Sequence, residues 1–124
     1  MQSQEDIQRQ YEEAVASLVA KVKRERNIIA AILGGSLSYD QVWEKSDIDM
    51  MLIQRDGKGA SSDHNLVENG INIHATVIPR HEFKRIVESV RQASFMHSYF
   101  SRSTLLFTED ESIREWYRNA NLHN

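Results

Sequence analysis

The chain has 124 residues, of which 40% are hydrophobic and 27% are charged, and its formal net charge is -3. These values predict one compact domain spanning residues 1–124 and exclude a disordered or fibrous protein. The small negative charge makes nucleic acid an unfavourable partner, and the absence of cysteine excludes disulfides and thiolate metal sites.

The chain contains no segment that resembles a membrane anchor. Its N-terminus is polar and acidic, and the longest apolar run, "IIAAIL" at 28–33, is far shorter than the roughly 20 residues that span a bilayer. We therefore expect a cytoplasmic protein without an export signal.

The first half of the chain alternates helix and strand. Apolar residues at spacings of three and four predict an amphipathic helix over about 5–26. The run at 27–33 is apolar on both faces and predicts a central strand that ends at Gly34-Gly35. A short helix could follow from residue 36 to about 41, and 47–54 predicts a second buried strand.

The middle of the chain predicts a loop and a hairpin. Residues 55–64 are rich in Gly, Ser and Asp and predict a loop. Asn69-Gly70 is a strong signal for a type I′ turn between strands at about 65–68 and 71–78, and Pro79 ends the second strand.

The last third returns to helix, strand and helix. We expect helices at about 80–93 and near 95–100, a strand at 104–108, and a capping box from Thr108 to Glu111 that opens a final helix. Together the elements predict the α+β class, with one mixed sheet and helices packed on it.

Two aspartates open the strand at 47–54. Residues two apart in a strand share a face, so Asp47 and Asp49 point the same way. Two such charges about 5 Å apart repel by roughly 3 kcal/mol at an effective dielectric near 20. A hard divalent cation with oxygen ligands is the natural partner for this pair.

A glycine-rich turn precedes the aspartates. Gly34, Gly35 and Ser36 end the preceding strand, where missing Cβ atoms let backbone N–H groups approach an anion and Ser36 adds a hydroxyl donor. A phosphate cradle beside metal-binding carboxylates predicts a site for a nucleoside triphosphate with Mg²⁺.

The spacing of these residues resembles the nucleotidyltransferase superfamily related to DNA polymerase β. Its signature is Gly-Ser, about ten residues, then Asp-x-Asp, and here Gly35-Ser36 precedes Asp47-Ile48-Asp49 by ten residues. "SDIDMML" is similar to the aminoglycoside and lincosamide enzymes, and the spacer to the minimal nucleotidyltransferases paired with HEPN-domain toxins. The resemblance implies the polymerase β-like fold, metal ions on the two aspartates and the triphosphate on the Gly-Ser turn.

One expected residue is missing. The family usually places a third carboxylate on the strand after the hairpin, where this chain has Asn72, His74 and Thr76 on one face. His74 is our first candidate for the third position and Asn72 the second. A one-metal enzyme, a nucleotide binder without turnover, or an acid from Glu68 or Glu82 also fits the sequence.

Two functions follow from these residues. The first is Mg²⁺-dependent transfer of a nucleoside monophosphate, preferably AMP from ATP, to a hydroxyl of a small-molecule or protein acceptor. The second is a degenerate nucleotide-binding or antitoxin-like module that binds a toxin-like protein. Larger relatives usually carry a helical acceptor domain after this one, and we expect none within residues 1–124. Either the sequence is part of a longer chain, or it belongs with the minimal forms, or a homodimer partner completes the cleft.

Overall fold

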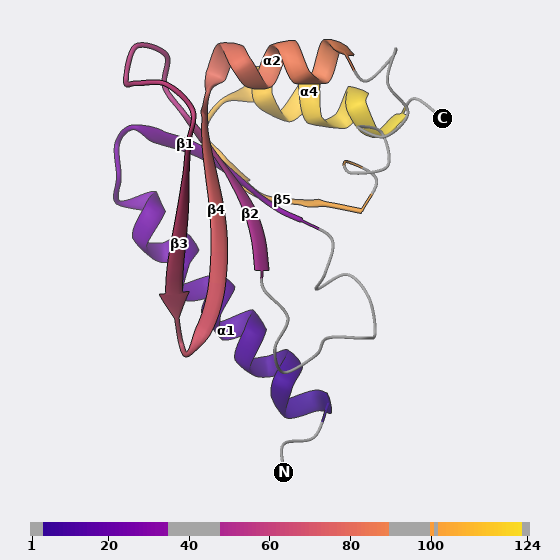
Figure 1. Cartoon of the computed structure of the whole chain (residues 1–124). Helices are drawn as coiled ribbons and strands as arrows, with labels where there is room; N and C mark the ends of the chain where they lie inside the picture. The colour runs from indigo at the N-terminus through magenta and orange to yellow at the C-terminus, as the bar shows by residue number, and fades with distance from the viewer. Residues whose placement is uncertain (1–3, 35–47, 90–99, 101, 123–124) are drawn as a thin grey trace.

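The computed structural model describes residues 4–34, 48–89, 100 and 102–122. Figure 1 shows its elements, which are α1 (Gln4–Lys23), β1 (Ile28–Leu33), β2 (Ile48–Gln54), β3 (Ser62–Glu68), β4 (Ile71–Pro79), α2 (Arg80–Ser89), β5 (Thr104–Thr108) and α4 (Glu111–Leu122). The short helix predicted after residue 35, and the helical piece predicted near 95–100 except Phe100, lie outside the described residues.

The strands form one mixed sheet in the order β3-β4-β2-β1-β5. β2 and β4 run parallel, and the other neighbouring pairs run antiparallel. The predicted α+β class with a mixed sheet is therefore confirmed. Because β4 pairs directly with β2, each residue of β2 has a neighbouring residue in β4 on the same face of the sheet.

One face of the sheet packs on α1. Alternate strand residues, among them Leu33, Met50 and Ile73, join a cluster with Tyr11 and Leu18 of the helix. Packing on the sheet explains why the apolar residues of the N-terminal helix recur at spacings of three and four, which places them on one face. The helix ends at Lys23 rather than near residue 26, because Arg24 and Glu25 donate turn hydrogen bonds to Lys21 O and Val22 O.

The opposite face packs on α2 and α4, which lie side by side at one end of the sheet in Figure 1. Ile32, Ile53 and Ile78 meet Phe83 and Phe100 in this second cluster. The two clusters explain why β1 is apolar on both faces. Among the described helices, none is both long and apolar enough to cross a membrane.

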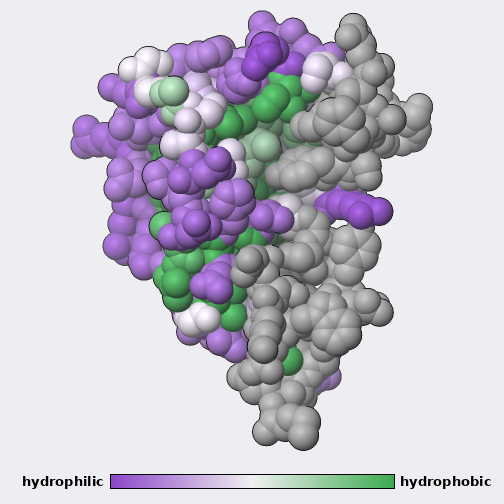
Figure 2. Space-filling view, in the orientation of Figure 1, coloured by the Kyte–Doolittle hydropathy of each residue, from purple (hydrophilic) through white to green (hydrophobic). Residues whose placement is uncertain are grey.

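The surface outside these clusters is mostly polar. Figure 2 shows hydrophilic side chains over much of the coloured surface, with apolar side chains visible in narrower areas between them. Scattered apolar exposure of this kind is normal for folded proteins.

The Asn69-Gly70 hairpin is confirmed. Both residues have positive φ, 50° and 76°, and Glu68 pairs with Ile71 across the turn. The prediction that β3 starts at residue 65 was wrong, because the strand starts at Ser62. The register set by the two-residue turn keeps the antiparallel pairing intact as far as Ser62 and Val77.

The final helix begins at a different cap from the one predicted. Asp110 Oδ1 accepts the N–H groups of Ser112 and Ile113, so Asp110 is the N-cap of α4. Thr108 instead accepts the N–H of Asp110 through its hydroxyl at 3.0 Å. The predicted capping box from Thr108 to Glu111 was therefore wrong, because the N-cap of α4 lies two residues after Thr108.

Candidate functional site

Three neighbouring strands share a polar surface beyond the area that α2 and α4 cover. Paired residues in adjacent strands point to the same side of a sheet. The polar members of this surface, called the open face below, are exposed or half-buried and comprise Asp49 of β2, Asp63 and Asn65 of β3, and Asn72, His74 and Thr76 of β4.

Gly34 brings the end of β1 against Asp49. Its N–H donates a hydrogen bond of 2.7 Å to Asp49 O. A Cβ at Gly34 would lie 3.1 Å from Asp49 Cβ and 3.2 Å from Asp49 O, which is tighter than most real Cβ contacts. The glycine thus favours close packing of the two strands here. Gly35, Ser36 and Asp47, the other predicted site residues of the motif, lie outside the described residues.

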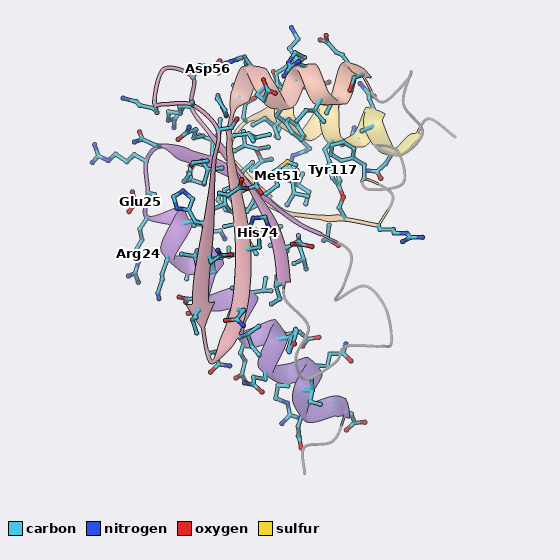
Figure 3. All side chains as sticks on the ribbon, in the orientation of Figure 1. Arg24, Glu25, Met51, Asp56, His74 and Tyr117 are labelled. Atoms are coloured by element: carbon cyan, nitrogen blue, oxygen red, sulfur yellow. The ribbon has the colours of Figure 1, made fainter. Side chains whose placement is uncertain are left out.

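His74 lies next to Asp49 on the open face. The parallel register of β2 and β4 pairs these two residues, and His74 Nδ1 is 3.6 Å from Asp49 Oδ1. Figure 3 shows His74 below Met51, on the side away from α2 and α4. Of the two candidates for the third position, His74 is the one whose partner in β2 is Asp49.

Asp63 is the residue of the open face that sequence reasoning missed. Its Oδ1 lies 3.3 Å from His74 Nε2 and accepts a hydrogen bond of 2.9 Å from Thr76 Oγ1. The prediction placed residue 63 in a loop. Counting outward from the Asn69-Gly70 turn pairs Asp63 with Thr76 and could have found it.

Glu68 and Glu82 do not lie on the open face. Glu68 points to α1, where it accepts hydrogen bonds from Ser17 Oγ at 2.7 Å and Lys21 Nζ at 2.8 Å. The hydrogen bond from Lys21, followed by that from Ser17, lowers the pKa of the Glu68 carboxyl. Glu82 pairs with Arg85 within α2. Neither acid supplies a carboxylate beside Asp49.

A hollow of about 240 Å³ lies on the β3–β4 hairpin beside His74. It is lined by Asn65, Leu66, Val67, Asn72, Ile73 and His74. Val67 is 65% exposed and adds an apolar surface next to the two amides. The hollow thus offers hydrogen-bond donors and acceptors as well as apolar contact directly next to His74.

Asp49 offers one donor of the kind that metal sites use. The side chain of Asp49 is 71% exposed and offers the hard oxygen donor that divalent cations such as Mg²⁺ prefer. Within the described ranges, no group of three or more His, Asp or Glu side chains could hold a metal ion by itself. The donor chemistry fits a divalent cation that takes further ligands from elsewhere.

Comparison with known structures identifies the fold. The chain is similar to a crystal structure described as a nucleotidyltransferase-like protein from Exiguobacterium sibiricum 255-15, with a TM-score of 0.64 and 12% sequence identity. The match covers 89% of this chain and 38% of that one, so the chain spans well under half of its length. No protein-family model and no curated protein matches the sequence. The fold is that of the nucleotidyltransferase-like class.

Proposed function

We propose that the protein is a metal-dependent nucleotidyltransferase that moves a nucleoside monophosphate, preferably AMP from ATP, to a hydroxyl of an acceptor. The observation that carries this proposal is the contact between Gly34 and Asp49. It joins the strand that leads into the Gly35-Ser36 turn to the second aspartate of the motif. The last described residue before the Gly35-Ser36 turn therefore lies against Asp49, which supports a shared site for the two halves of the motif.

The residues then have distinct roles. Asp47 and Asp49 would hold Mg²⁺ or a similar ion, and Gly34, Gly35 and Ser36 would receive the triphosphate. The bound ion would neutralise negative charge on the phosphates. In the reaction the acceptor oxygen bonds to the α-phosphorus, the bond to the pyrophosphate oxygen breaks, and the hydroxyl proton passes to solvent. His74 would stand where the family places its third acid.

A binding and transfer experiment tests this proposal. Full-length protein with Mg²⁺ or Mn²⁺ is expected to bind ATP in calorimetry, and Asp47→Ala or Asp49→Ala is expected to abolish binding. Glu115→Gln, a change at an exposed position of α4, serves as a control and should bind normally. With α-³²P-labelled ATP and pooled hydroxyl acceptors, label should appear in a product. Absence of divalent-dependent ATP binding would refute the proposal.

A catalytically degenerate module is the second candidate. It is favoured by the imidazole of His74 in register with Asp49, where the family carries a carboxylate. Such a module would bind a nucleotide and a toxin-like protein or a second copy of the chain. The His74→Asp variant separates the two functions. A gain of transfer would show a degenerate site, whereas loss of existing transfer would give His74 a positive role.

A further inference from the structure

The imidazole of His74 lies between two carboxylates from different strands. Nδ1 is 3.6 Å from Asp49 Oδ1, and Nε2 is 3.3 Å from Asp63 Oδ1. The two ring nitrogens thus face different neighbours. His74 is half-buried, and the side chains of Asp49 and Asp63 are 71% and 69% exposed.

We propose that His74 binds, through Nδ1, the same metal ion that Asp49 binds, and that Asp63 orients the imidazole from behind. The ion is then one that accepts nitrogen as well as oxygen, such as Mn²⁺, in preference to Mg²⁺. This inference rests on the proposed function for the presence of a metal at Asp49, and adds a ligand, a positioning residue and a metal class.

The distance between His74 Nδ1 and Asp49 Oδ1 supports shared coordination. At 3.6 Å it is too long for a hydrogen bond. Two donors bound to one ion with bonds of about 2.1 Å lie roughly 3.0 to 3.6 Å apart for angles of about 90° to 120°. The observed separation lies at the upper end of this range, so a small movement of the two side chains toward each other would let one ion bridge them.

Asp63 provides the second part of the arrangement. Histidines that bind metals usually donate their other ring N–H to a carboxylate, which selects the tautomer and holds the ring. Nε2 faces Asp63, and the hydroxyl of Thr76 holds the same Asp63 oxygen at 2.9 Å. With the proton on Nε2, the lone pair of Nδ1 is directed toward Asp49.

The ligand set determines the class of metal. Mg²⁺ favours oxygen ligands alone, whereas imidazole suits first-row transition ions and carboxylate and phosphate also suit Mn²⁺. One imidazole among carboxylate and phosphate oxygens therefore favours Mn²⁺ over Mg²⁺. A third carboxylate at position 74 would reverse this preference.

Pulsed electron paramagnetic resonance of Mn²⁺ tests the proposal without an activity assay. Full-length protein with Mn²⁺, alone and with ATP, is expected to show ¹⁴N modulation from a bound imidazole. His74→Ala should lose the modulation, and His74→Asp should also lower the ratio of Mn²⁺ to Mg²⁺ affinity. His64→Ala is the matched control, because His64 lies on β3 and its Nε2 forms a hydrogen bond of 2.9 Å with Ser62 Oγ. The control should keep the signal.

Variants at position 63 test the positioning role. Asp63→Ala is expected to weaken Mn²⁺ binding by about 10-fold to 100-fold, whereas Asp63→Asn should retain most of the affinity because its amide oxygen still accepts the N–H of Nε2. If Asn weakens binding as much as Ala, the charge of Asp63 matters rather than its orientation of the ring, and this role is refuted. Circular dichroism checks that each variant is folded.

The outcomes separate the two proposals. Mn²⁺ binding that depends on Asp49 but shows no ¹⁴N modulation overturns the role of His74 and leaves the proposed function standing. Failure to bind Mn²⁺ even with ATP refutes the inference, and failure to bind ATP with either Mg²⁺ or Mn²⁺ refutes the proposed function as well. Modulation that persists in His74→Ala also overturns the inference, because the nitrogen then comes from another residue.

Discussion

Gly34 has no side chain, and this allows the end of β1 to pack closely against Asp49. The N–H of Gly34 donates to Asp49 O at 2.7 Å, and a methyl group at Gly34 would crowd Asp49. A glycine at this point was predicted to let a phosphate approach. The structure adds a reason internal to the fold, which holds whether or not a phosphate is bound.

We predict that Gly34→Ala destabilises the protein and disturbs the metal site. The new methyl would crowd backbone and Cβ atoms of Asp49, and we expect the small shift that relieves this contact to cost about 1 to 3 kcal/mol. Urea denaturation should show the loss, and calorimetry should show weaker Mn²⁺ binding. Gly57→Ala is the control. It has φ +84° and open space, so it should lose about 1 kcal/mol and bind Mn²⁺ normally. Equal metal affinity in both variants would contradict the prediction.

Glu68 predicts a specific pH dependence of stability. Its pKa in the folded protein lies below the ordinary value of 4.5, because Lys21 and then Ser17 donate hydrogen bonds to the carboxylate. The stabilisation is therefore complete above the pKa of the unfolded chain. It is lost as the pH falls below 4.5 through the lower folded pKa.

The free energy of unfolding of Glu68→Gln should accordingly fall less than that of the wild type as the pH is lowered. At neutral pH we expect it to lose about 1 kcal/mol, since hydrogen bonds to a charged group become neutral ones. Urea titrations at several pH values measure the free energy of unfolding. Glu12→Gln, at an exposed position of α1, is the control and should follow the wild-type curve. Parallel curves for Glu68→Gln and wild type would count against the prediction.

At the scale of elements, Asp110 joins α4 to α2. It caps α4 through the N–H groups of Ser112 and Ile113, and Arg80 Nε donates to it at 2.7 Å. Burial raises the pKa of its carboxyl, but the hydrogen bonds from Arg80 and Ser112 outweigh this and lower it. One side chain therefore holds a helix end and an inter-helix contact together.

Asp110→Ala should destabilise the protein by about 1 to 2 kcal/mol, because the cap is lost and Arg80 loses its partner. Asp110→Asn keeps an oxygen for the cap but removes the charge, and should lose clearly less. Chemical denaturation compares the two. If Asn and Ala are equally destabilising, the cap contributes little and the ion pair carries the effect.

The elements could largely be predicted from local patterns. β1, β2 and β4 are apolar on the faces they bury, and α1 shows its stripe. The prediction for β3 was too short, because its first residues are polar and exposed. Such residues are common in strands at the edge of a sheet. Its extent depends on pairing with β4, which local hydropathy does not contain.

The candidate site was partly predictable for the same reason. Asp49 and His74 follow from spacing and alternation along single strands, and the structure pairs them. Asp63 needs the register of the hairpin, a long-range property that the two-residue turn encodes. The sequence also gave no signal for two ion pairs, Lys21 with Glu68 and Arg80 with Asp110, because the members of each pair lie far apart in the sequence.

For the whole molecule, the sheet carries two cores of different extent. α1 packs on the first, while α2 and α4 pack on the second at one end of the opposite face. Asp49 and His74 lie beyond that second core, on strands that carry other residues of the core. Donors on strands of a regular sheet are positioned more precisely than donors on loops, which suits a site that must hold ligands in fixed geometry.

Binding at the open face should therefore raise the stability of the entire domain. At a ligand concentration of 100 times Kd, linkage contributes about 2.7 kcal/mol, or a rise in Tm of roughly 5 to 15 °C for a domain of this size. Thermal unfolding with Mn²⁺ and ATP measures the shift. Asp49→Asn should show no rise, and a similar rise in that variant would place the ligand elsewhere.

The position of β3 at the sheet edge has a consequence for the exchange of its amide hydrogens. An edge strand bonds to one neighbour only, so its ends open more readily than those of central strands. Asp63 lies one residue from the start of β3, and its release would free the ring of His74 without unfolding the domain. The affinity of the proposed metal site should thus depend on how long the outermost strand stays closed, and a molecule bound along that edge should raise it.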